Sequence, residues 1–200
     1  DLSSYYSDDE LDVFRLSSKS HWDVPVSVNG TIVHILASHP TPPVFDDGTE
    51  TDLENPSFAD WNGLRNHDAI RFWGDYVDPL ASDYIYDDNG NTGGLARGAR
   101  FVIVGDQNAD PVDGDSSFNP IDNVLSSPFV DTTFTPASMG GADFVLENAP
   151  GSSAPETKTS SFNLRTDYVL PSVVGLEIED GATFWPPADD LRADQVTDTD

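Results

Sequence analysis

Ten residues in the middle of the chain, FVIVGDQNAD at 101–110, constrain the fold most strongly. Four apolar residues with high β propensity run into Gly105, and the polar residues Asp106, Asn108 and Asp110 follow. We expect a buried strand that ends at the rim of a sheet. Because residues two apart on a strand share a face, Asp106 and Asn108 are predicted to point the same way. In one interpretation the Asp activates a water and the Asn donates to a phosphate oxygen, which suits phosphoester chemistry. In the other, the ten residues are simply a strand that ends in a polar turn, and the sequence of this run fits both equally well.

The charge balance is strongly acidic and unusual in composition. Acidic residues outnumber basic ones by 36 to 9, which gives a formal net charge of -27 at pH 7. Aspartate is spread along the whole chain, so an acidic interaction tail fits poorly. Asp-rich surfaces with few lysines hold water and cations in concentrated salt, so we expect a halophilic or marine origin. Such a surface repels nucleic acid at low salt, so a phosphate-bearing substrate would need metal ions or high ionic strength to approach.

Length and composition fit one globular domain, with 200 residues of which 37% are hydrophobic. There is no cysteine, which excludes disulfides and thiolate metal sites. No apolar run approaches the roughly 20 residues of a membrane span, and no signal-peptide pattern opens the chain. Residue 1 is Asp rather than an initiator Met, so we expect that an upstream segment was removed or left out.

The pattern of apolar residues predicts a mixed α and β domain rather than a sandwich of strands alone. Two β-forming runs, 24–28 and 31–38, are joined by Asn29-Gly30, a strong hairpin signal. Residues 60–80 place large apolar side chains at helical spacing, and Pro79 would end that helix. Four further elements are predicted: a strand at 101–104, a short helix at 121–126, and strands at 167–170 and 175–178. Loops are predicted at 1–12, 40–60, 81–100 and 131–160.

His39 is the histidine best placed for chemistry, because it leaves the apolar run TIVHILAS directly before Pro40. From there it could reach a site at the sheet edge and exchange a proton with a phosphate near neutral pH. A half-exposed surface histidine is the alternative interpretation. His34 lies inside the same run and is interpreted as structural, and His21 and His67 are not favoured for chemistry.

The run DQNAD at 106–110 imitates the first half of a calcium loop, D-x-N-x-D. Pro111 stands where the loop needs Gly, and a Ser stands where it needs a bidentate Glu, so an EF-hand is rejected. A looser cation site on Asp110, Asp113 and Asp115 would take Ca²⁺ or another divalent ion. Solvated loop carboxylates are the alternative interpretation in so acidic a chain.

A third polar cluster lies in NLRTDYVLPS at 163–172. Asp167 is predicted to begin a strand, where its carboxylate could hold an imidazole or a metal. Arg165 could pair with Asp167 or contact phosphate, and a simple salt bridge at the strand start fits as well. No phosphate-binding Gly-rich loop occurs, because GNTGG at 90–94 lacks the required spacing. Neither G-x-S-x-G nor H-E-x-x-H is present.

Four segments, ILASHPTPP, RNHDAIRFW, FVIVGDQNADP and NLRTDYVLPS, stand in the order seen in the endonuclease/exonuclease/phosphatase superfamily of deoxyribonuclease-I-like metallophosphoesterases. From about residue 16 to 187 the chain resembles large secreted bacterial and archaeal members. The resemblance implies an α/β (α+β) fold, a four-layer sandwich of two mixed β-sheets with helices outside. It implies that His39 is catalytic or binds phosphate, that Asp106 orients water or binds metal, that Asn108 binds the scissile phosphate, and that Asp167 supports a partner histidine. It also implies Mg²⁺ or Mn²⁺.

Two elements of that family pattern have no counterpart in residues 1–200. These are the early strands with an Asn and a metal-binding Glu, and the closing Ser-Asp-His strand. We therefore expect a single partial domain, the C-terminal part of the fold. Its N-terminal half would lie upstream or in a separate chain, because a lone piece would expose a sheet face.

Three functions stay open from the sequence. The first is a metal-dependent phosphoesterase that hydrolyses phosphodiesters or phosphomonoesters, nucleic acid included, as part of a larger secreted or cell-surface protein. The second is a non-catalytic acidic structural or binding module derived from the same fold. The third is a calcium-stabilised adhesive domain. Substrate specificity should lie in the long loops at 40–60, 81–98 and 131–160.

Overall fold

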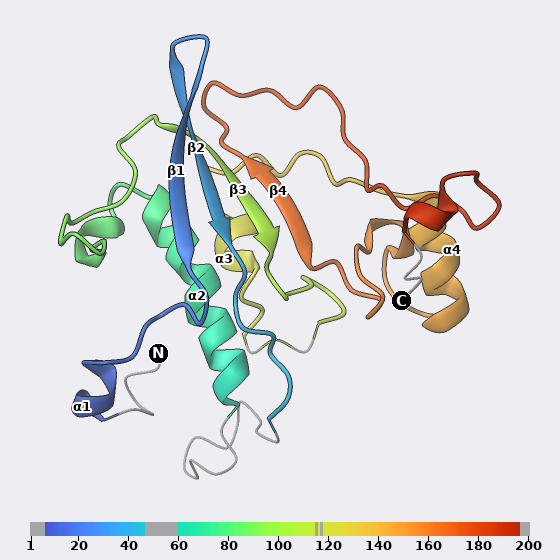
Figure 1. Ribbon diagram of the computed structural model, residues 1–200, viewed down its shortest axis with the longest axis horizontal. Coiled ribbons are helices and arrows are strands. Elements are labelled where there is room, and N and C mark those ends of the chain that lie inside the picture. The colour runs from blue at the N-terminus through green and yellow to red at the C-terminus, as the bar shows by residue number, and fades with distance from the viewer. Residues whose placement is uncertain (1–6, 47–59, 115, 117, 197–200) are drawn as a thin grey trace.

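The computed structural model describes residues 7–46, 60–114, 116 and 118–196, and their centre is one mixed sheet of four strands (Figure 1). The strands are β1 (His21–Val28), β2 (Thr31–Ser38), β3 (Arg100–Asp106) and β4 (Asp167–Pro171), in that order across the sheet. β2 and β3 run parallel, whereas the pairs β1–β2 and β3–β4 are antiparallel. The predicted α/β class is confirmed, and the second sheet of the predicted sandwich stays a prediction.

The predicted hairpin joins β1 to β2. Asn29 and Gly30 both adopt positive φ, 52° and 81°, between the paired residues Val28 and Thr31. Two consecutive positive φ angles make the tight turn that matches the twist of the two strands.

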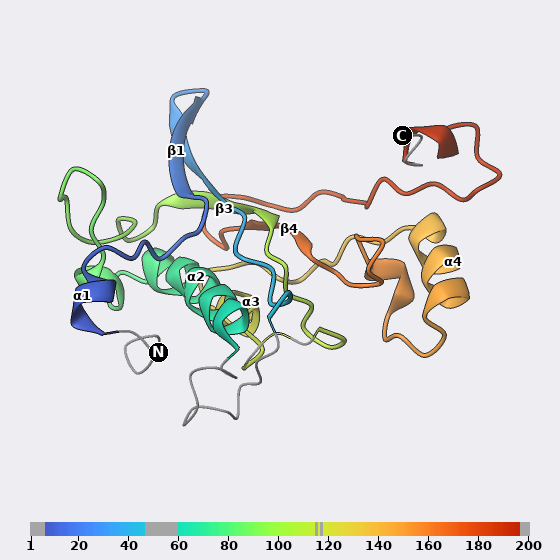
Figure 2. The ribbon, with the colours of Figure 1, turned by 60° about the horizontal axis from the view of Figure 1, so that its bottom comes forward.

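A long helix, α2 (Trp61–Val77), covers one face of the sheet together with the short helix α3 (Asp122–Leu125) (Figure 2). α2 begins where the side chain of Asp60 accepts a hydrogen bond from the backbone of Gly63, and it ends just before Pro79. Its buried Ile70 and Trp73 join the core cluster that includes Ile103 of β3. Both predicted helices are confirmed.

The predictions for the segments at 131–160 and 175–178 were wrong. The excursion at 131–160 contains α4 (Met139–Asn148), which begins at Ser138 and packs against the 3₁₀ turn Pro155–Thr157. The helix was missed because the Gly140-Gly141 pair lowers the helix propensity of the segment. Glycine is needed at 140, since a Cβ there would lie 2.2 Å from the carbonyl oxygen of Pro186. The strand predicted at 175–178 does not form, because the chain turns away after β4 at Gly175, where φ is +69°.

Three shorter elements complete the description. They are α1 (Asp8–Leu11), within the segment predicted as a loop, and 3₁₀ turns at Ser82–Tyr84 and Ala193–Gln195. Among the helices described, none is both long and apolar enough to cross a membrane.

The second face of the sheet points away from α2 and α3. Buried Ile103 and Tyr168 point toward the helices, so their neighbours Val104 and Val169 belong to the opposite face. By the same alternation Asp106 and Asp167 lie on that second face, at the end where β3 finishes and β4 begins.

Candidate functional site

One edge of the sheet gathers three of the residues singled out from the sequence. His39 directly follows β2, Asp106 ends β3 and Asp167 begins β4. Because β2 and β3 are parallel and β4 is antiparallel, these three positions meet at the same edge (Figure 1). Asp106 and Asp167 are direct partners across the strand pair, and Nε2 of His39 lies 3.5 Å from Oδ2 of Asp106.

Asp106 is the most constrained group at this edge. Its side chain is 34% exposed, and Oδ1 accepts a hydrogen bond of 2.7 Å from the backbone N–H of Asn108. Burial is the main cause that raises the pKa of Asp106. The Asn108 N–H opposes it, the charge of Asp167 adds to it, and His39 and Lys19 act against it. Two carboxylates across one strand pair therefore favour a proton or a cation between them.

The prediction that Asn108 shares a strand face with Asp106 was wrong. β3 ends at Asp106, and Asn108 adopts a φ of 51°, so the alternation of a strand no longer applies. Its amide Nδ2 donates to the carbonyl oxygen of Pro40 at 3.1 Å. Asn108 thus links the turn after β3 to the segment after His39.

Gly105 allows the two strand ends to approach each other. Its φ is +134°, and a Cβ there would lie 2.1 Å from the carbonyl oxygen of Ser38. The hydroxyl of Ser38 accepts from the indole Nε1 of Trp73 at 2.7 Å and donates to Oε1 of Gln107 at 3.2 Å. The helix α2 therefore holds both strand ends through a buried polar chain.

Asn66 is a second buried residue that links the two segments by hydrogen bonds, and the sequence did not predict this role. This fully buried residue of α2 directs Nδ2 at the carbonyl oxygens of Thr41 (2.9 Å) and Gln107 (3.0 Å), with that of Asn108 at 3.5 Å. One amide thereby spans the segments that carry His39 and Asp106. The available signal was a polar residue on the apolar side of the predicted helix, four residues before Ile70.

The loop carboxylates predicted as a loose cation site lie beside a buried lysine. Nζ of Lys158 is 2.8 Å from Oδ2 of Asp110 and 2.6 Å from Oδ2 of Asp113. Asp110 also accepts the backbone N–H groups of Val112, Asp113 and Arg165. Asp115 lies outside the described residues. Asp110 therefore joins the turn after β3 to the segment that leads into β4.

Arg165 and Asp167 form no ion pair with each other in the described structure. The guanidinium of Arg165 lies 4.5 Å from the ring centre of Tyr168. Asp167 accepts from the hydroxyl of Thr166 at 3.2 Å, and its backbone N–H donates to the hydroxyl oxygen of Thr159.

The remaining histidines have neighbours typical of structural roles. Nδ1 of His34 is 2.7 Å from Oδ1 of Asp23, and Nε2 of His21 is 2.8 Å from the carbonyl oxygen of Ala69. Burial is the main cause that lowers the pKa of His21. His67 pairs with the adjacent Asp68.

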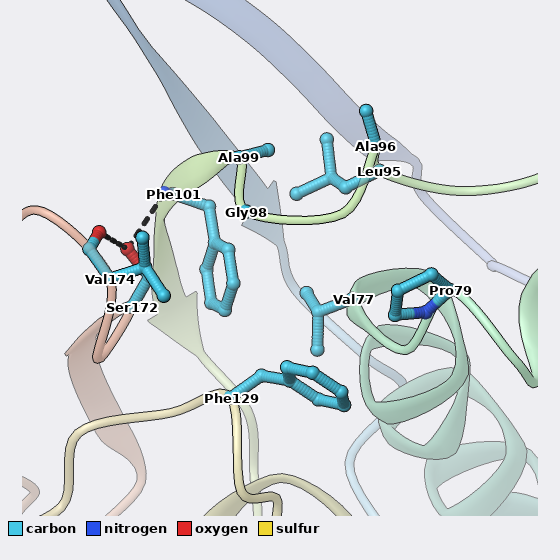
Figure 3. A pocket seen from close by; sticks show the side chains of 10 residues that line it. All are labelled: Val77, Pro79, Leu95, Ala96, Gly98, Ala99, Phe101, Phe129, Ser172 and Val174. Atoms are coloured by element: carbon cyan, nitrogen blue, oxygen red, sulfur yellow. Dashed lines mark hydrogen bonds between the residues drawn. The ribbon is translucent and has the colours of Figure 1, made fainter.

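A small apolar pocket lies away from this edge, at the start of β3 (Figure 3). Val77, Phe101 and Phe129 point into it, and its volume is about 20 Å³. It has room for little more than one water, and no ionisable side chain lines it within the described part of the chain. It is a packing gap rather than a substrate site.

The sheet edge offers two carboxylates as candidate donors for a divalent cation. In the described segments no three His, Cys, Asp or Glu side chains gather as a complete ligand set. Asp106 and Asp167 nevertheless provide two adjacent carboxylates, and their mutual repulsion is relieved by a cation. Mg²⁺ is commonly bound through one or two carboxylates, with water and substrate phosphate as further ligands.

Comparison with known proteins gave one match. The sequence model described as the endonuclease/exonuclease/phosphatase family matches residues 12–198, which is most of the chain. A search of curated proteins found no match.

Proposed function

The chain belongs to the endonuclease/exonuclease/phosphatase family, and from this premise we propose that it hydrolyses phosphoesters with a divalent metal at the edge formed by His39, Asp106 and Asp167. The observation that carries the proposal is the 3.5 Å approach of His39 to Asp106, with Asp167 as the strand partner of Asp106. These three residues come from segments more than 60 residues apart, so the fold brings them together rather than local sequence.

Each side chain has a role that its surroundings support. Asp106, held by the Asn108 N–H, would orient a water and accept its proton. The imidazole of His39 would contact the phosphoryl group or donate a proton to it. Asn66 acts as a positioning residue, because it holds the segments that carry both groups.

Asp106 and Asp167 are the residues that would hold Mg²⁺ or Mn²⁺. When bound, such an ion stabilises negative charge on the phosphoryl oxygens.

The proposal is tested by hydrolysis of bis-p-nitrophenyl phosphate and p-nitrophenyl phosphate in high salt. We expect turnover with Mg²⁺ or Mn²⁺, its loss when EDTA removes the metal, and its return when metal is added back. Release of p-nitrophenol gives the rate. A chain that is folded by circular dichroism and inert with both ions would overturn the proposal and favour a non-catalytic acidic module.

The proposal includes the class of substrate and an extracellular localisation. A net charge of -27 favours a small or extracellular phosphate ester over tight binding of nucleic acid, because polyanions are repelled at low salt. The same charge supports a secreted protein that works in concentrated salt.

A further inference from the structure

A larger cavity, of about 420 Å³, lies next to the sheet edge. Asp167 and Gly105 line it, so it adjoins the candidate site, whereas His39 and Asp106 are not among its lining residues. A volume in this range is typical of small-ligand sites. The cavity therefore lies next to His39 and Asp106 but is separate from them.

Arg165 supplies the positive charge in the lining of this cavity. It is the one basic side chain among the described residues that line the space. The Tyr168 ring, 4.5 Å away, holds the guanidinium by a cation–π contact, which leaves the N–H donors in its plane uncommitted by that contact. Within the described chain, no carboxylate lies within ion-pair distance of it. A planar fork of this kind suits bidentate binding of a phosphate or carboxylate.

Thr159 adds a second donor. Its hydroxyl oxygen accepts the backbone N–H groups of Thr166 (3.0 Å) and Asp167 (3.1 Å). A hydroxyl oxygen has two acceptor positions, so both are used and the O–H proton is left to donate. Thr159 and Arg165 both line the cavity, and both can only donate there.

Apart from Asp167 and Thr183, the rest of the lining is largely apolar. It includes Val104 and Val169 from the second face of the sheet, and Pro136 and Ala182 from two loop segments. Apolar walls with a few donors bind the carbon skeleton of a ligand and fix its anionic end.

We propose that this cavity binds a second anionic group of a small substrate, with Arg165 as the specificity-determining residue. The substrate class is a compact molecule that carries a scissile phosphate and a further phosphate or carboxylate. The inference rests on the proposed hydrolytic function, because it assigns the substrate of that same site.

The experiment compares glucose 6-phosphate with glucose 1,6-bisphosphate, which differ by one phosphate. In the wild type we expect kcat/KM to be at least about tenfold higher for the bisphosphate, the effect of one hydrogen-bonded ion pair. Arg165→Gln should remove this preference, mainly through KM, and leave p-nitrophenyl phosphate hydrolysis within about twofold. Arg165→Lys, which keeps the charge and loses the planar fork, should retain part of the preference.

A binding measurement separates this inference from the proposed function. Isothermal titration of the metal-free protein with methylenebisphosphonate, whose P–C–P link is not hydrolysed, should give about tenfold weaker binding for Arg165→Gln. Thermal unfolding of each variant checks that the loss of the Tyr168 contact has not unfolded the chain. Hydrolysis with equal substrate preference and equal titration in wild type and Arg165→Gln would overturn the inference while the phosphoesterase stands. Arg165-dependent binding without any hydrolysis would support the pocket and overturn the enzyme.

Discussion

Replacing Lys158 by Met is expected to lower the free energy of unfolding by about 3–5 kcal/mol, the usual cost of removing one partner of a buried ion pair. The Lys158 side chain is only 2% exposed, and the Asp110 side chain only 1%. The substitution leaves the Asp110 carboxylate buried, with backbone N–H donors as its remaining hydrogen-bond partners. Urea unfolding at constant salt, followed by tryptophan fluorescence, measures the loss.

The chain offers a matched control in its other lysine. Lys19 is exposed, and its ammonium is 3.5 Å from the carbonyl oxygen of His39. Lys19→Met should change the unfolding free energy by no more than about 0.5 kcal/mol. Equal losses for the two variants would show that net charge, and not the buried pair, is responsible.

The effect of Lys158→Met should depend on pH. Burial acts to raise the pKa of Asp110, but hydrogen bonds from the Asp113 N–H, Lys158 and other backbone N–H groups outweigh it, so that pKa is lowered. The hydrogen bond from Lys158 is the main cause that lowers the pKa of Asp113. A carboxyl whose pKa is lowered by folding contributes stability above its unfolded pKa, and that stability is lost as the pH falls through the folded value.

The wild type and Lys158→Met should therefore converge in stability as the pH falls below the ordinary Asp value of about 3.9. Urea unfolding repeated from neutral to acidic pH tests this. A difference that stays constant with pH would contradict an electrostatic origin and point to lost packing of the lysine stem.

Local signals account for the parts of the fold that the sequence predicts well. Asn29-Gly30 specifies its own turn, and α2 carries both an apolar side and a stop at Pro79. The run at 101–104 is apolar on every residue, and β3 has a strand on each side, β2 and β4. Each of these signals acts within a few residues and is independent of what the element packs against.

The features that the sequence did not predict depend on distant partners. Lys158 and Asp110 are 48 residues apart, so nothing local marks the lysine as buried. α4 has only one apolar run after its two glycines, and the tertiary contact of Gly140 with Pro186 explains why a helix tolerates them. The predicted strand at 175–178 had the right residue types and no neighbouring strand to pair with in the described structure.

The candidate site falls between these cases. The sequence could single out His39, Asp106 and Asp167 as candidate site residues because each stands at one end of a recognisable strand. The 3.5 Å distance from His39 to Asp106 and the cross-strand pairing of Asp106 with Asp167 follow from the strand order. The network that holds them could not be chosen, because Asn66, Ser38 and Gln107 act through backbone carbonyls and side chains of other segments.

Asp106→Asn is expected to lower the hydrolysis of bis-p-nitrophenyl phosphate by about 10²–10⁴-fold, the typical contribution of a positioned acid or base. Asparagine has nearly the same shape, and its oxygen can still accept the hydrogen bond from Asn108. The substitution removes the negative charge, and with it the ability to accept a proton and the attraction for a divalent ion. Initial rates at saturating metal measure the loss.

The same variant should be at least as stable as the wild type, because burial and Asp167 raise the pKa of Asp106 and so make its charged form unfavourable in the folded state. At neutral pH that penalty disappears with the charge, and thermal unfolding should show an unchanged or higher midpoint.

Asp131→Asn is the matched control. The Asp131 carboxylate also accepts a backbone N–H from the residue two positions on, Thr133, but its segment pairs with the far end of β4. Its hydrolysis should stay within about twofold of the wild type. Lower activity with unchanged or higher stability, seen for Asp106→Asn but not for Asp131→Asn, would show that the Asp106 charge serves catalysis. A loss of both activity and stability would instead show that Asp106 supports the fold.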